Sequence, residues 1–134
     1  MTLRSELEVR LEDWANAQDP VIPIAWEGVS FIRPEGTDET TAYLQPFLMP
    51  ALTVNPTVDG TRSRLSGIFQ INIWTRENYG PAYGEEIAEA LINLYPVVPK
   101  TGTVSIEQTP SVTQALYDAG WRIVPLTIRY RQEK

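Results

Sequence analysis

The stretch 64–96 constrains the fold most, because its hydrophobic period changes once within it. In residues 69–73, large apolar side chains alternate with Gln and Asn, which is typical of a strand with one buried face. In residues 83–95, apolar side chains recur at helical spacing while glutamates occupy the other side. Pro81 suits the first turn of such a helix, and Pro96 cannot extend it. The sequence therefore predicts a strand, a Gly-Pro turn and an amphipathic helix that pack on each other.

Other segments show the same two periods. Residues 3–17 repeat Leu and Trp at steps of four and three, which predicts another helix. Residues 42–54 are apolar enough for a strand, and we expect them to pair antiparallel with 64–76 through a long hairpin, because Asp59-Gly60 is a turn signal. Further short strands are predicted at 21–27, 103–108 and 124–131, whereas residues 113–117 are ambiguous. We therefore expect a single domain over 1–134 of the α+β class, with a mainly antiparallel or mixed sheet and both helices on one face.

Prolines inside the predicted strands limit where those strands can lie, since proline cannot donate to a sheet ladder. Pro23 argues that segment 21–27 lies at an edge or carries a bulge, and Pro125 argues the same for the last strand. Two prolines in segment 42–54 leave its register open. An edge strand that ends in Arg129 and Arg131 is protected against uncontrolled pairing, yet it also suits a controlled subunit interface.

The composition excludes several classes of function. The chain has 134 residues, no Cys and no His, so thiolate nucleophiles, Ser-His-Asp triads and the usual zinc ligands are all ruled out. The net charge of -6 argues against a broad nucleic-acid-binding face, because such faces depend on Lys and Arg. No apolar run is long enough for a membrane helix, and charged residues stand where a signal peptide would be apolar. We expect a cytoplasmic protein.

No catalytic constellation stands out. Glu85, Glu86 and Glu89 form the one carboxylate cluster; it is either a solvated helix face or, at most, a site for a hard cation completed by water. We expect no enzyme activity, no metal and no cofactor, so function should lie in surfaces. The loop 28–40 is either a solvated connection or a contact surface, because Phe31 and Ile32 must pack on something. A different class, a small-molecule-binding domain, would line an apolar pocket with the four tryptophans. These are Trp14, Trp26, Trp74 and Trp121.

Several stretches carry a family resemblance that spans nearly the whole chain. They are PIAWEGV at 23–29 with Phe31 and Pro34, GIFQINI at 67–73, Gly80-Pro81 before a helix that ends in LYP at 94–96, PSV at 110–112, and Gly120-Trp121 followed by VPLTIRY at 124–130. This pattern resembles a family of small bacteriophage and prophage proteins, the tail terminators, similar to the minor tail protein that caps the tail tube of long-tailed phages.

The resemblance implies a structural virion protein that forms a ring, a hexamer, stops tail-tube polymerisation and prepares the head-tail junction. Its partners would be other copies of itself, the tail tube protein and a head-completion or neck protein, first in the host cytoplasm and then in the virion. A compact chain of this length is about 36 Å across, and six in a ring leave a hole of about that width. DNA would pass without specific binding, and an acidic subunit suits that passage.

On this hypothesis the hairpin 53–63 and the loop 33–41 are the candidate contact surfaces. The candidate interface residues are Arg33, Asp59, Arg62, Arg64, Arg129 and Arg131, with Arg62 and Arg64 in ion pairs. The alternative within the same class is a neck or tail-completion protein, which resembles the terminators in fold and acts at the same junction.

Overall fold

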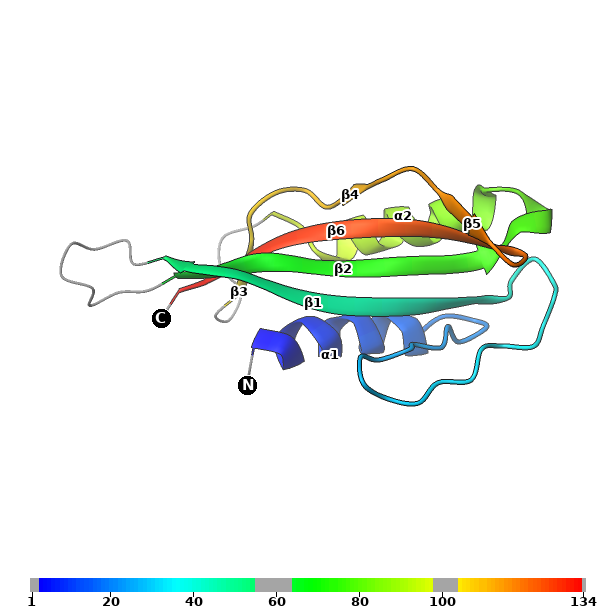
Figure 1. The fold of residues 1–134 in the computed structure, drawn as a ribbon, viewed down its shortest axis with the longest axis horizontal. Helices are drawn as coiled ribbons and strands as arrows, with labels where there is room; N and C mark the ends of the chain where they lie inside the picture. Colours follow the sequence, from blue (N-terminus) through cyan, green and yellow to red (C-terminus); the bar gives the residue numbers. More distant parts are fainter. Residues whose placement is uncertain (1–2, 55–63, 98–103, 134) are drawn as a thin grey trace.

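The computed structural model describes residues 3–54, 64–97 and 104–133. Its elements, in chain order, are α1 Leu3–Asn16, β1 Ala42–Val54, β2 Arg64–Arg76, the short 3₁₀ helix η1 Glu77–Tyr79, α2 Ala82–Leu94, β3 Val104–Ile106, β4 Ser111–Val112, β5 Leu116–Asp118 and β6 Trp121–Glu133 (Figure 1). The α+β class, the two helices and the mainly antiparallel sheet are as predicted. No helix in these ranges is long and apolar enough to cross a membrane.

Three long strands form the body of the sheet. The order is β1-β2-β6-β3, and the short strands β4 and β5 also pair with β6 (Figure 1). The predicted hairpin partners, 42–54 and 64–76, are confirmed, since β1 and β2 have these bounds and pair antiparallel. The sequence left the register open, and the structure places Leu44 opposite Ile73 and Pro46 opposite Ile71. The register shifts only between Pro50 and Thr53.

Both helices cover one face of this sheet, as the two hydrophobic periods predict. The main core joins Leu7 and Leu11 of α1, Ile87 and Leu91 of α2, and the inward side chains of the long strands. The inward strand residues are Leu44, Phe69, Ile71, Ile73, Val124, Leu126, Ile128 and Tyr130. The apolar stripe of each helix is buried because it packs against the apolar face of the sheet. Fully burying one such side chain contributes about 1.5 to 3 kcal/mol to the stability of the fold.

The position predicted for the last strand is wrong. β6 is neither an edge strand nor bulged at Pro125: it pairs with β2 in unbroken register on one side and with β3, β4 and β5 on the other. The backbone N–H of Thr113 donates to the carbonyl of Pro125, so the nitrogen of Pro125 lies on the same side, between the β4 and β5 pairings. The missing donor therefore lies opposite Thr113, where the pairing with β4 ends, so only one hydrogen bond at the end of a short strand is lost.

The predicted strand 21–27 lies at a sheet edge but is not a regular strand. It pairs with β1 through a single parallel bridge, Ile24 with Leu44. The N–H of Ala25 donates to the carbonyl of Leu44 at 2.7 Å, and the N–H of Leu44 donates to the carbonyl of Pro23 at 2.9 Å. Proline is tolerated here because Pro23 begins this short pairing, in which its carbonyl accepts from Leu44 and its nitrogen is not needed as a donor.

Tyr95 links the two helices inside the core. It is fully buried, and its hydroxyl donates to the carbonyl of Leu7 at 2.8 Å. We expect Tyr95→Phe to lower the free energy of unfolding by about 1 kcal/mol, because one buried hydrogen bond is lost. Burial raises the pKa of the Tyr95 hydroxyl, so this stabilisation is complete below the unfolded-state pKa and is lost as pH rises above it. Urea unfolding of both proteins at pH 7 and in the alkaline range checks this, and an equal difference at both would contradict it.

Candidate functional site

The face of the sheet opposite the helices, here called the open face, carries a second hydrophobic cluster. Tyr43, Trp74, Trp121 and Ile123 are buried together there, with Ala25 and Phe31 packed against them. The rings of Tyr43 and Trp74 stack with centroids 5.1 Å apart, and Trp121 meets Tyr43 edge-on at 5.2 Å. The pairings Tyr43 with Trp74 and Trp74 with Ile123 explain the cluster, because directly opposite side chains lie on the same face.

This cluster was not predicted, although the sequence contains a signal for it. Tyr43 and Trp74 fall on the polar phase of their strands, between the core residues on either side. Antiparallel pairing of 42–54 with 64–76 brings the start of one strand opposite the end of the other. Aromatic residues at both ends therefore indicated a second apolar site on the far face.

Arginines border the cluster. The guanidinium of Arg33 lies 5.0 Å from the ring centre of Trp74, and that of Arg76 lies 4.5 Å from the ring centre of Trp121. Cation–π contacts of this kind contribute about 0.5 to 1 kcal/mol each at exposed sites. Burial raises the pKa of the Tyr43 hydroxyl, while the nearby positive charge of Arg33 acts in the opposite direction. Arg33, predicted as an interface residue, is thus held in place by its own chain and remains exposed.

Two side-chain contacts, made by Phe31 and Arg33, hold the segment 29–33, here called the outer segment. The ring of Phe31 lies 5.1 Å from that of Tyr43, and Arg33 covers Trp74. Ile32 stands between these anchors and is 87% exposed, and Val29 is also exposed. Ile32 therefore lies outside the ring contacts that its two neighbours make. Of the two apolar residues that the sequence required to pack, Phe31 does and Ile32 does not.

The loop that follows is held by a local network. The carboxylate of Asp38 accepts hydrogen bonds from the hydroxyls of Thr40 and Thr41 and from the N–H of Thr40, all between 2.9 and 3.0 Å. The hydrogen bond from Thr41, followed by those from Thr40, lowers the pKa of Asp38. This arrangement fixes the entry into β1.

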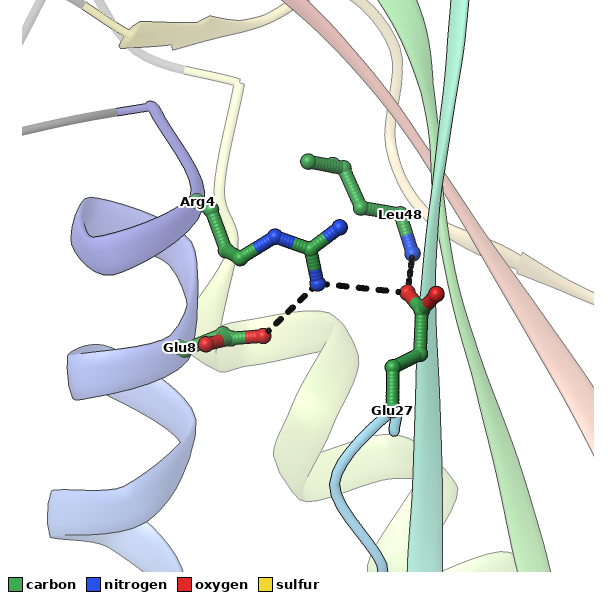
Figure 2. A network of polar contacts seen from close by, with 4 residues as sticks. All are labelled: Arg4, Glu8, Glu27 and Leu48. Atoms are coloured by element: carbon green, nitrogen blue, oxygen red, sulfur yellow. Dashed lines mark hydrogen bonds and ion pairs between the residues drawn. The ribbon is translucent and has the colours of Figure 1, made fainter. Parts of the chain in front are cut away.

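The outer edge of β1 is closed to further strand pairing as far as Pro50. The N–H of Leu44 is used by Pro23, and Pro46 and Pro50, two and six residues further along the same edge, have no N–H. Between them, the N–H of Leu48 donates to Glu27 Oε1 at 2.6 Å (Figure 2). The two prolines that left the register open in the sequence thus serve to protect an edge.

Glu27 is itself held by an arginine from α1. Arg4 Nη1 lies 3.3 Å from Glu27 Oε1 and 3.2 Å from Glu8 Oε2 (Figure 2). These ion pairs are partly exposed to solvent, so they stabilise the fold little and serve mainly to orient the carboxylate.

We expect Glu27→Ala to expose the Leu48 donor and to increase self-association through the β1 edge, with a stability loss of about 0.5 to 1.5 kcal/mol. Glu27→Gln is the matched control, because its amide oxygen still accepts from Leu48 while the charge is removed. Light scattering at increasing concentration measures the association. If Glu27→Gln increases self-association as much as Glu27→Ala does, then the lost charge, and not the exposed N–H of Leu48, causes the association.

The opposite edge of the sheet differs. β4 and β5 pair with β6 and with no other strand in the described part of the chain. Leu116 and Tyr117 of β5 are 58% and 64% exposed, and Val112 of β4 is also exposed. An edge with exposed apolar side chains and no proline is a surface on which another chain can dock.

The predicted interface residues are not brought together. Arg129 and Arg131 lie opposite Ile68 and Ser66, about 20 Å and about 26 Å along β2 from the position of Arg33 over Trp74. Arg129 is exposed on the open face. Arg64 begins β2, and Asp59 and Arg62 lie outside the described residues. The interface prediction at these six positions therefore stays a prediction.

The four tryptophans do not line one pocket. Trp14 and Trp26 pack against the main core, whereas Trp74 and Trp121 belong to the cluster on the open face. A cavity of about 320 Å³ opens at the start of α2, between Tyr79, Tyr83 and Thr75, with Glu39, Glu86 and Arg76 in its wall. Its mixed charges select no ligand class. Among the described residues, no group of three or more carboxylates could hold a metal ion.

Comparison with known proteins identifies the family of this chain. The family described as phage tail terminator protein matches residues 2–130. A solved structure superposes with a TM-score of 0.77 at 30% sequence identity, covering 97% of this chain and 92% of the other. No protein with a curated description matches the sequence. The match over almost the entire chain shows that this protein belongs to the phage tail terminator family and is a structural component of the phage tail.

Proposed function

We propose that this protein caps the growing tail tube, ends its polymerisation and prepares the head-tail junction as a ring of six copies. The family match over residues 2–130 carries this proposal, because it places the whole described fold in the terminator family. The partners are further copies of the chain, the tail tube protein and a head-completion protein. Assembly takes place in the host cytoplasm before the protein enters the virion, and DNA passes through the ring without specific binding.

Two features of the fold support a ring. One edge of the sheet is closed by prolines and by Glu27, whereas the other edge exposes Leu116 and Tyr117. Two unlike edges are compatible with head-to-tail contacts, which close into rings when the rotation permits. The net charge of -6 also suits a channel that DNA must slide through.

Deletion of the gene in the phage, with complementation from a plasmid, tests the proposal. We expect overlong tail tubes without the protein and tails of normal length when it is supplied, both counted by negative-stain microscopy. Finished tails of normal length that fail to join heads would instead assign the protein to the neck, which is the competing role. Light scattering of the purified protein across a concentration series, with and without tail tubes, measures whether a ring of about six copies forms.

A further inference from the structure

Two polar groups lie buried beneath the start of α2 without a hydrogen-bond partner among the described residues. They are the hydroxyl of Thr75, a residue that is 3% exposed, and Nη1 of Arg122. Thr75 and Arg122 lie directly opposite each other in β2 and β6. Each is two residues from a core residue of its strand, Ile73 or Val124, so both lie on the face that the helices cover. A buried donor without an acceptor is costly, and a charged donor more so, which indicates a bound group.

Gly84 shows where these two groups point. A Cβ atom at this position would lie 2.9 Å from Arg122 Nη1 and 3.5 Å from Thr75 Oγ1. Both groups therefore face the first turn of α2, and we call this place the α2 recess. Thr75 also lines the cavity of about 320 Å³ at the start of α2, so the recess lies beside that cavity.

The start of α2 adds hydrogen-bond donors to the same place. The N–H of Glu85 donates to the carbonyl of Pro81 at 2.9 Å, so the three N–H groups before it have no acceptor within the helix. Pro81 occupies the N-cap position and has no side-chain acceptor to offer them. A helix N-terminus also carries a partial positive charge. A ligand of the α2 recess must therefore supply acceptors.

We propose that the α2 recess binds a carboxylate group, which accepts hydrogen bonds from Arg122 Nη1 and from the hydroxyl of Thr75. Arginine pairs well with carboxylates, and helix N-termini bind anions. In the cavity wall, Glu39 and Glu86 stand against Arg76. These wall charges select no ligand by themselves, but they disfavour a doubly charged anion such as phosphate more than a singly charged carboxylate.

This site does not depend on the proposed ring. The carboxylate belongs either to a small molecule in solution or to an Asp or Glu side chain of another tail protein. The chemistry that the recess recognises is the same in both cases.

A titration of the purified protein with sodium acetate tests the site, and sodium chloride at equal ionic strength is the reference. We expect acetate to give saturable NMR shifts at the amides of Ala82, Tyr83 and Gly84 and at the Nε–H of Arg122. Chloride should give smaller shifts that do not saturate. The absence of saturable shifts with acetate, or an equal response to chloride, would overturn the inference. Tighter binding of inorganic phosphate than of acetate would also overturn it.

Two variants locate the binding. Arg122→Gln should weaken acetate binding by at least about tenfold, because a charged hydrogen bond is lost. Gly84→Ala retains every donor but places a methyl group in the recess, and alanine favours the helix, so it should weaken binding in a folded protein. Arg10→Gln is the matched control: it changes the net charge equally, but Arg10 lies over the ring of Tyr95 at the other end of α2. Natural affinity in both recess variants would overturn the inference.

Complementation of the deleted phage gene with Gly84→Ala distinguishes the two sources of the carboxylate. Defective tails from a folded variant that no longer binds acetate would assign the carboxylate to an acidic side chain of another tail protein. Normal tails from the same variant would assign it to a small molecule in solution. The proposed function is tested separately by the deletion itself, so it stands or fails independently of this site.

Discussion

Ile71→Ala is expected to lower the free energy of unfolding by about 2 to 5 kcal/mol, the range for removing a large side chain from a packed core. Ile71 is fully buried and lies in the middle of β2, in the core that both helices cover. The lost methyl groups leave a cavity that neither the sheet nor the helices can fill without moving. Urea unfolding followed by far-UV circular dichroism measures the difference.

The matched control is Ile68→Ala in the same strand. Ile68 lies opposite Met49 and Arg129 on the open face and is only partly buried. The same substitution should cost about 1 kcal/mol or less there, because little apolar surface is lost and no closed cavity forms. Similar costs for the two variants would contradict the assignment of the two faces.

Trp74→Ala is expected to lower the free energy of unfolding by about 3 kcal/mol and also to release the outer segment. Trp74 stacks on Tyr43, contacts Trp121, supports Arg33, and donates from its indole N–H to Gln45 at 3.1 Å. Without the indole ring of Trp74, Arg33 loses its cation–π contact. Hydrogen exchange at residues 29–33 should therefore become faster.

Trp74→Phe provides the comparison. It keeps an aromatic surface for Tyr43 and Arg33 but removes the N–H donor, so we expect a smaller stability loss, about 1 to 2 kcal/mol, and little change in exchange at 29–33. If Trp74→Ala is as stable as the natural protein, or if exchange at 29–33 stays unchanged in it, then the cluster does not hold the outer segment.

Much of the fold follows from local pattern. Phe69, Ile71 and Ile73 fix the inward face of β2, and the stripe of α2 fixes the side that packs on it. The hairpin bounds, the position of the helices on one face and the fold class were predicted because each rests on a hydrophobic period that only one arrangement buries. The family resemblance was likewise confirmed, because its stretches include the strand and turn residues that build this fold.

The prolines show what local pattern leaves undecided. Pro125 suggested an edge strand, yet β6 is interior, because the chain that pairs beside it is interrupted at that point. Pro46 and Pro50 obscured the register of β1, although both are compatible with it at an outer edge. A missing donor is harmful only where a partner requires it, and the sequence does not say which side of a strand has a partner.

The sequence by itself determined the two periods, the pairing of β1 with β2 and the exclusion of thiolate and imidazole chemistry. Tertiary structure alone decided that Phe31 is covered while Ile32 is exposed, and that one sheet edge is closed by Glu27 while the other is open. The physical reason is that hydrophobic periods report burial along one element. Whether a face or an edge is covered depends on residues distant in the chain, such as Glu27 beside Leu48 or Arg33 over Trp74. The hydrophobic period of one segment does not indicate which other segment will cover it.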